Sequence, residues 1–225
     1  MRKWHFFVRQ PLQLVLLLIL CGGLWLAASI PGMRITHSLH VTVGTVMAVS
    51  IAIGVLHQLW VLVFWRLELG SSAISRRFGH SGFILYSVGF AVLITARLAS
   101  IIYLAPLNRG TLPLPPAFRL AAVVIIALFS LWGMCSVLRY FGARRALGLD
   151  HFDPAVRRKG LVTGGAYRYF GNVMYLIILP VFCIPGLLWA SMASTLLGIF
   201  HYAYVWVHYY CTELPDMAVI YGRRE

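Results

Sequence analysis

Acidic residues are scarce in this sequence. Of its 225 residues, 6 are Asp or Glu, 19 are Lys or Arg, 11% are charged and 60% are hydrophobic. A typical soluble domain has about 25% charged residues, so this composition excludes an ordinary soluble fold. We therefore expect a protein that crosses a membrane several times.

Paired cysteines and polar linkers are also missing. The four cysteines are scattered without a CxxC pair, which indicates neither a disulfide framework nor a zinc site. The sequence has no internal repeat or low-complexity tract, so we expect one membrane domain. Neither a Walker-type glycine loop nor a Ser/His/Asp or Cys/His arrangement is legible, which argues against phosphoryl transfer and hydrolysis.

Six apolar windows indicate the architecture. Four have the length of a membrane span, and two shorter windows interrupted by proline follow them: 11–30, 41–64, 82–106 and 119–138, then 173–189 and 191–208. We predict an all-α polytopic fold of four spans and a C-terminal helical hairpin. The first window also has the basic start, apolar core and "AAS" of a cleaved signal peptide, which is the alternative interpretation.

Positive charges fall unevenly on the loops between these windows. If the loops alternate across the membrane, fifteen Lys and Arg lie on one side and three, Arg34, Arg109 and Arg119, on the other. The positive-inside rule then places both termini and the 139–171 segment in the cytoplasm. Because topology accounts for most of the net charge of +13, we expect no nucleic-acid partner. Arginine greatly outnumbers lysine, which hints at a GC-rich bacterial genome and hence at a bacterial inner membrane.

One charge, Arg97, falls near the middle of the third window. A charge at that depth is costly, so we expect it to face the bundle interior or a wet cavity. It either pairs with backbone carbonyls or snorkels outward, or it contacts a substrate headgroup.

Two stretches carry the information about function. In the first, 139–171, we expect a continuation of the fourth helix, a break at "DHFDP" and then a strand-like loop at "LVTGGAYRYF" that covers a site at the membrane surface. The second, "HYAYVWVHYYCTELPDMAVIYG" at 201–222, combines many aromatic residues with Glu213. An interfacial aromatic belt accounts for the tyrosines but does not call for a carboxylate. His201 and His208 stand about 10 Å apart along a helix, too far for one metal ion without other ligands, so we expect no metal.

Together the two stretches offer glycines, an amide, aromatic faces and a carboxylate. Glycine lets a backbone approach a ligand, an amide reads polar edges, aromatic faces attract cations, and a carboxylate accepts hydrogen bonds from an amine or a ribose. These are the requirements for holding a sulfonium nucleotide.

The sequence "GLVTGGAYRYFGNVMY" resembles a loop of the integral-membrane methyltransferases that include phospholipid N-methyltransferases and isoprenylcysteine carboxyl methyltransferases. The matching positions are Gly160, Val162, Thr163, Gly165, Tyr167, Arg168 and Tyr169, followed by Asn172, Met174 and Tyr175. A second family element follows about 40 residues later, where "ELPDMAVIYG" matches at Glu213, Pro215, Ile220 and Tyr221. The resemblance covers 116–225 as a methyltransferase-like membrane core, whereas the helices of 1–115 carry no recognisable motif.

This resemblance implies an S-adenosylmethionine-dependent enzyme that methylates a lipid amine such as phosphatidylethanolamine. It implies cofactor contacts at Tyr167, Asn172, Tyr175 and Glu213, with Gly165 and Gly171 shaping the loop. Glu213 and His208 are the candidate catalytic residues, His208 as a proton acceptor. A roof of arginines is expected to hold the lipid phosphate. Asn172 could instead cap the fifth helical segment.

The chain departs from the family pattern at Gly171, Val173 and Leu214, where a charged residue, a proline and a second glutamate are usual. Three alternatives therefore stay open. The acceptor could be an isoprenylcysteine carboxylate or a small amphipathic molecule. The protein could also be a membrane reductase of related architecture that binds a nicotinamide cofactor, or a non-catalytic member of the family.

Overall fold

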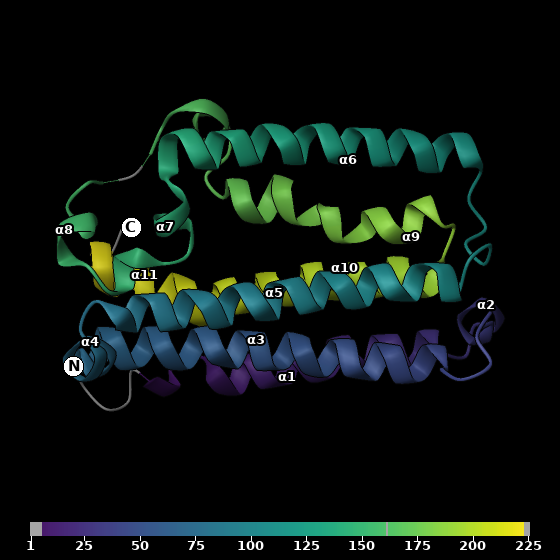
Figure 1. Cartoon of the computed structure of the whole chain (residues 1–225), viewed down its shortest axis with the longest axis horizontal. Coiled ribbons are helices and arrows are strands. Elements are labelled where there is room, and N and C mark those ends of the chain that lie inside the picture. Colours follow the sequence, from purple (N-terminus) through teal and green to yellow (C-terminus); the bar gives the residue numbers. More distant parts are fainter. Residues whose placement is uncertain (1–5, 161, 223–225) are drawn as a thin grey trace.

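The computed structural model describes residues 6–160 and 162–222, and these contain helices, turns and loops but no strand. Four helices have the length and apolar character needed to cross a membrane: α1 (Gln10–Ala27), α3 (Val43–Ser71), α5 (Ser81–Leu107) and α6 (Pro116–Ser136). The last continues into a π-helical turn, η2 (Val137–Phe141). The protein is therefore an all-α polytopic membrane protein, as the apolar windows predict (Figure 1).

Shorter elements close the ends of the bundle and form the C-terminal hairpin. They are α2 (Pro31–Arg34), α4 (Ala73–Phe78), α7 (Ala143–Ala146), η3 (Leu149–His151), α8 (Pro154–Arg157), η4 (Gly165–Arg168), η5 (Met174–Ile178), η6 (Leu179–Cys183), α9 (Ile184–Leu188), α10 (Met192–His208), η7 (Tyr209–Glu213) and α11 (Leu214–Tyr221). The first arm of the hairpin comprises η5, η6 and α9, and the second arm is α10. The start and the end of the chain lie at the same end of the bundle (Figure 1).

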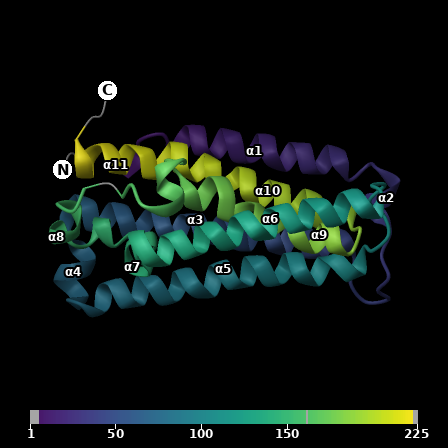
Figure 2. The ribbon, with the colours of Figure 1, turned by 90° about the horizontal axis from the view of Figure 1, so that it is seen from above.

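Helix α10 is the centre of the bundle. Seen from above, α1 and α5 lie on opposite sides of it (Figure 2). Its buried residues Leu197, Phe200 and Tyr204 join the largest apolar cluster, which also includes Leu24 of α1 and Ile101 of α5. The C-terminal part of the chain therefore shares one core with the N-terminal helices.

Helix α3 extends beyond the window predicted for it. The apolar window ends at residue 64 because Arg66 and Glu68 follow, yet the helix runs to Ser71. Both charges have partners: Arg66 Nε lies 3.2 Å from Asp216 Oδ1, and Glu68 Oε2 accepts a hydrogen bond from the Ser75 amide at 2.9 Å. Buried charges that are paired no longer oppose helix formation in an apolar environment.

The first arm of the hairpin is irregular because Pro180 and Pro185 interrupt it. Proline has no amide hydrogen, so backbone carbonyls in the preceding turn lose their helical donor. Ser130 of α6 compensates, since its hydroxyl lies 3.0 Å from the Ile177 carbonyl and 3.2 Å from that of Ile178. A non-helical backbone at membrane depth is thereby satisfied within the protein.

The 139–171 segment begins as a continuation of α6, as predicted, but this helix ends at Phe141, before "DHFDP", and the last part of the segment is not strand-like. Asp153 caps α8 after the break at "DHFDP" and accepts a hydrogen bond from the Ala155 amide at 2.8 Å. The expected extended loop is instead a 3-10 turn, η4, and Leu161 lies outside the described residues. An isolated strand has no neighbour for its backbone hydrogen bonds, whereas here Ser136 Oγ accepts from the Ala166 amide at 3.0 Å and fixes the turn against α6.

Arg97 lies in the bundle interior, as predicted, and is fully buried. Its guanidinium contacts His201 Nδ1 at 3.0 Å and His57 Nδ1 at 3.1 Å, and it donates to the His201 carbonyl at 3.2 Å. The other ring nitrogen of His201 lies 2.8 Å from Ser50 Oγ. The donors of this guanidinium are therefore hydrogen-bonded to side chains and a backbone carbonyl within the bundle.

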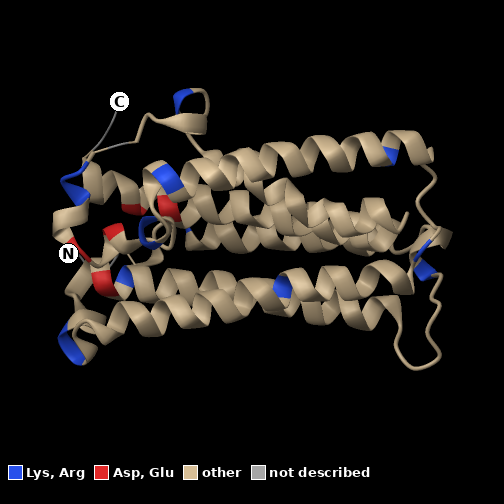
Figure 3. Ribbon diagram, turned by 45° about the horizontal axis from the view of Figure 1, so that its top comes forward, with Lys and Arg blue, Asp and Glu red and all other residues tan. Residues whose placement is uncertain are grey.

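Charge is concentrated at the end of the bundle that holds the termini (Figure 3). The described acidic residues all lie there, on α3, the 139–171 segment and the C-terminal turns: Glu68, Asp150, Asp153, Glu213 and Asp216. Arg34, Arg109 and Arg119 belong to the opposite end. The loops thus alternate between the two ends as the charge count assumes.

Candidate functional site

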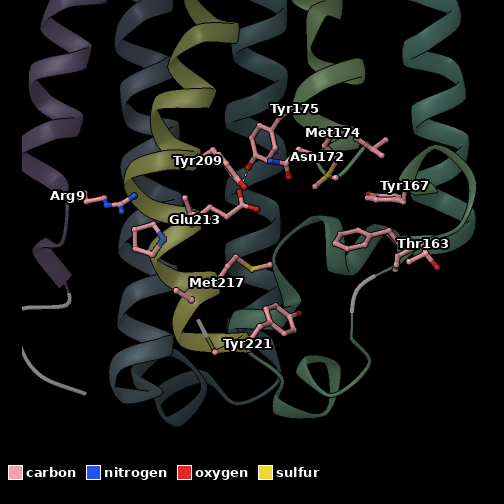
Figure 4. A pocket seen from close by; sticks show the side chains of 18 residues that line it. Arg9, Thr163, Tyr167, Asn172, Met174, Tyr175, Tyr209, Glu213, Met217 and Tyr221 are labelled. Atoms are coloured by element: carbon pink, nitrogen blue, oxygen red, sulfur yellow. Dashed lines mark hydrogen bonds between the residues drawn. The ribbon is translucent and has the colours of Figure 1, made fainter. Parts of the chain in front are cut away.

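A cavity of about 720 Å³ lies at the charged end of the bundle (Figure 4). The two stretches singled out in the sequence form most of its wall. Its lining residues are Arg9, Phe141, Val162, Thr163, Tyr167, Gly171, Asn172, Val173, Met174, Tyr175, Tyr209, Glu213, Leu214, Pro215, Met217, Ala218, Tyr221 and Gly222. Segments about 40 residues apart in the chain thus meet around one space.

Glu213 reaches this cavity because the end of α10 widens into the π-helical turn η7. Pro215 cannot donate to the Cys211 carbonyl, as an ordinary residue would in an α-helix. Two side chains replace that donor: Arg66 Nη2 lies 3.1 Å from the Cys211 carbonyl oxygen and Gln10 Nε2 lies 3.4 Å from it. The turn that carries Glu213 is therefore held by both α3 and the start of α1.

The carboxylate of Glu213 accepts a hydrogen bond from the hydroxyl of Tyr175, the short contact drawn as a dashed line in Figure 4. Burial raises the pKa of Glu213 to about 7, the Tyr175 hydrogen bond opposes this rise, and the carboxylates of Asp216 and Asp150 add to it. The ring of Tyr175 lies 5.4 Å from that of Tyr209, centroid to centroid. This wall therefore presents aromatic faces around a carboxyl group that titrates near neutral pH.

The opposite wall is built by the 139–171 segment. Tyr167 stacks on Phe141 with ring centroids 5.4 Å apart, and burial raises the pKa of the Tyr167 hydroxyl to about 12. That hydroxyl is buried and has no hydrogen-bond partner among the described residues. A buried donor without a partner is costly, so it is available to a ligand.

Asn172 lines the cavity, and its side chain makes no capping hydrogen bond among the described residues. The capping position of η5 is Val173, and no side-chain cap is present there. The backbone carbonyl of Asn172 accepts a hydrogen bond from the Leu176 amide at 2.9 Å. The side-chain amide of Asn172 lies beside Tyr175 (Figure 4). The cofactor-contact and capping interpretations of Asn172 both stay predictions.

The two glycines differ in their roles. Gly171 lines the cavity, and a Cβ built there would have no atom within 4 Å. Gly165 does not line it; its φ is +59°, and a Cβ there would come within 2.8 Å of Ser136 Oγ. Gly165 therefore shapes the loop without reaching the cavity.

His208 is buried and is not among the lining residues of the cavity. It is 3% exposed, and its ring centroid lies 6.0 Å from that of Trp65. Neither ring nitrogen has a hydrogen-bond partner among the described residues. The structure thus brings together five of the seven predicted site residues, Tyr167, Gly171, Asn172, Tyr175 and Glu213, and leaves Gly165 and His208 outside the lining.

The two walls are tied together by a network that the sequence did not suggest. Arg145 Nη2 lies 3.0 Å from the Tyr221 hydroxyl, and Arg145 Nε lies 3.1 Å from Asp150 Oδ2. The Tyr221 hydroxyl also donates to Asp150. The sequence signal for this network was Asp150, an acidic residue within a cationic segment. The motif "DHFDP" that contains it was interpreted only as a helix break.

Among the described residues, no roof of arginines lies over the cavity. Arg145 is engaged with Asp150, and Arg157 donates to the carbonyls of Asp150 at 2.7 Å and His151 at 2.8 Å. Arg9, immediately before α1, is the one Lys or Arg among the described lining residues. Its role could not be foreseen, because about 200 residues separate it from Glu213 in the chain.

Comparisons with protein-family models, with curated proteins and with solved structures give no match for this chain.

Proposed function

We propose that the protein is an integral-membrane methyltransferase that moves a methyl group from S-adenosylmethionine to a lipid amine such as phosphatidylethanolamine. The observation that carries the proposal is the meeting of the two methyltransferase-like stretches around one cavity. They are separated by the helical hairpin, and nothing in their spacing alone requires that they face each other.

The cavity suits such a cofactor in size and in chemistry. Its volume of about 720 Å³ falls within the range of about 300–1,000 Å³ that encloses ligands of this class. Tyr167, Tyr175 and Tyr209 offer aromatic faces to a cation, and Glu213 offers a negative charge. The unpartnered hydroxyl of Tyr167 and the side-chain amide of Asn172 offer hydrogen bonds to a nucleoside.

When bound, S-adenosylmethionine supplies an electrophilic methyl group on a positively charged sulfur. The residues of the chain have to provide a neutral acceptor, because a lipid amine with a pKa of about 10 is mostly protonated at pH 7. Glu213, with its pKa raised to about 7, can take up that proton at its carboxylate. Tyr175 holds the carboxylate in place. This assigns proton acceptance to Glu213 in preference to the buried His208.

The departures from the family pattern fall at different places. Val173, which stands where the family usually has proline, is fully buried in an apolar cluster with Val137 and Ile177. It therefore contributes to apolar packing at this position. Leu214 and Gly171 line the cavity, where a second carboxylate and a charged residue are usual in the family. The proposed site therefore relies on Glu213 as the one carboxylate of its described lining.

We further propose that the cavity faces the cytoplasm in a bacterial inner membrane. The excess of Arg and Lys at the end that holds the cavity supports this orientation. The methyl donor is a soluble metabolite, so its site needs access from that compartment.

The test is expression in a host that lacks phosphatidylcholine, followed by lipid mass spectrometry with a labelled methyl donor. We expect methylated phosphatidylethanolamine with the unaltered protein and none with Glu213→Gln. Asp153→Asn is the matched control, because Asp153 lies at the same end outside the cavity lining and Asn keeps its cap of α8. If no lipid gains label and S-adenosylmethionine does not raise the melting temperature of the folded protein, the proposal is abandoned.

A further inference from the structure

We propose that Arg9 binds the phosphate of the lipid acceptor and so makes the enzyme selective for amines carried on a phospholipid headgroup. This inference rests on the proposed function. It begins from the described lining of the cavity, in which Arg9 is the one Lys or Arg. Within the part of the chain that the structure describes, Arg9 is thus the cation of the lining with which a phosphate in this cavity can pair, since a guanidinium is a permanent positive charge.

Arg9 lies at the depth at which phosphates occur in a bilayer. It immediately precedes α1, a candidate membrane span that begins at Gln10. Along that helix, apolar side chains are exposed on the outside of the bundle: Leu14, Val15, Leu18, Ile19, Trp25 and Leu26. The residue before the first turn of a lipid-facing span stands at the membrane interface, where lipid headgroups are found.

An aromatic group next to Arg9 supports the same depth. Trp206, Tyr209 and Tyr210 contact one another with ring centroids 5.1–5.9 Å apart, and the Tyr210 side chain is 51% exposed. Clustered Trp and Tyr are enriched at the headgroup level. The guanidinium of Arg9 is thus placed beside a surface that suits the entry of a lipid.

The contacts of Arg9 leave donors for a ligand. Among the described residues its guanidinium makes one hydrogen bond, from Nη1 to the Tyr210 carbonyl at 2.9 Å. A guanidinium carries five N–H groups in a planar fork that matches a phosphate. The remaining donors are not used by the described part of the chain, and Arg9 itself is exposed.

The backbone holds Arg9 in an uncommon conformation. Its φ is +59°, in the left-handed region that residues other than glycine rarely adopt. The Arg9 carbonyl accepts from the Gln13 amide at 3.0 Å, and the Gln13 side chain accepts from the Thr212 hydroxyl at 3.0 Å. The start of α1 is therefore anchored to η7, so Arg9 keeps a fixed position relative to Glu213.

This position fits the chemistry of phosphatidylethanolamine, in which two carbons separate the phosphate from the amine. Figure 4 shows the Arg9 side chain directed toward the turn that carries Glu213 and Tyr209. A phosphate at Arg9 therefore keeps the amine on the side of the cavity where Glu213 can take its proton.

The test compares two acceptors in the purified protein: phosphatidylethanolamine in detergent micelles and a long-chain primary amine without a phosphate. We expect Arg9→Gln to raise the KM for phosphatidylethanolamine about 10- to 100-fold, the loss typical of a charge-assisted contact, and to leave the KM for the simple amine unchanged. Arg9→Lys should recover part of the loss. Arg76→Gln is the control, because Arg76 is exposed on α4 at the same end and does not line the cavity.

A second readout does not depend on turnover. Native mass spectrometry should show phosphatidylethanolamine retained by the unaltered protein and by Arg76→Gln, and lost from Arg9→Gln. Equal retention by Arg9→Gln, or an equal rise in KM for both acceptors, overturns the inference. So does weaker binding of S-adenosylmethionine by Arg9→Gln, because the guanidinium then holds the carboxylate of the cofactor. Failure of the unaltered protein to methylate either acceptor refutes the proposed function instead.

Discussion

Glu213 shows how position in the bundle changes the chemistry of one side chain. A glutamate carboxyl in water has a pKa of about 4.3, whereas burial raises that of Glu213 to about 7. The same residue on an exposed helix would be ionised throughout the physiological range. Here its charge changes near neutral pH, which suits a group that takes up a proton from an amine.

The first prediction concerns the pH dependence of cofactor binding. Below about pH 7 Glu213 is neutral, and above it the carboxylate attracts a sulfonium, so affinity for S-adenosylmethionine should rise as pH rises through about 7. The bound cation favours the ionised form and shifts the midpoint downward. Isothermal titration between about pH 5.5 and pH 8.5 measures this dependence.

Two controls make this prediction specific. Glu213→Gln should flatten the pH profile and weaken binding about tenfold at pH 8, the loss of one charge-assisted contact. S-adenosylhomocysteine, which has a neutral sulfur, should show a weaker pH dependence with the unaltered protein. An unchanged slope in Glu213→Gln would mean that another group governs the titration.

At the scale of the elements, the hairpin depends on glycine where its arms cross. A Cβ built at Gly198 of α10 would lie 3.1 Å from Cys183 Cα and would also press on the Phe182 carbonyl. These atoms belong to the backbone of the first arm, which cannot yield as a flexible side chain can. Small residues at such crossings let two helices approach closely in a membrane.

We predict that Gly198→Ala destabilises the protein by about 1–3 kcal/mol, because overpacking forces the two arms of the hairpin apart. Gly23→Ala is the matched control in α1, where a Cβ would have no atom within 4 Å. It should be neutral or should stabilise the helix by about 0.5–1 kcal/mol. Unfolding in mild detergent measures both changes. Equal destabilisation by the two substitutions would contradict close packing at Gly198.

At the scale of the whole molecule, charge and topology agree. Most of the described Arg and Lys residues lie at one end of the bundle (Figure 3), and the elements that line the cavity meet at that end. Arg34 on α2, Arg109 between α5 and α6, and Arg119 on α6 belong to the other end. The uneven distribution of positive charge therefore predicts the orientation of the bundle in the membrane, which its apolar surface alone does not predict.

The orientation can be measured with fusions to reporter proteins. A fluorescent protein that matures only in the cytoplasm should fluoresce when fused after Glu225 and stay dark when inserted between Arg109 and Thr111. Alkaline phosphatase, which is active only outside the cytoplasm, should give the opposite pattern at the same two sites. The reverse of both patterns would place the cavity on the other side and refute the cytoplasmic site.

Much of this protein could be derived from its sequence, because the physical cause is local. Apolar runs of about 20 residues predict spans through the need to satisfy backbone hydrogen bonds inside lipid, and four of them are helices in the structure. Proline predicted the interruption of the hairpin. Glycine, aromatic and acidic residues in two stretches indicated the walls of a cavity.

Tertiary structure decided what depends on groups far apart in the chain. The end of α3 depended on Asp216, which pairs with Arg66 from 150 residues away. The turn at η4 replaced the expected strand because Ser136, 30 residues before Ala166, supplied a hydrogen-bond acceptor and no second strand was present in the described residues. His208 is buried outside the lining of the cavity. Arg9 lines the cavity because α1 packs on α10 and η7. A sequence pattern indicates which groups of a segment require hydrogen-bond or ion-pair partners. Which residues become those partners is decided only when the helices pack.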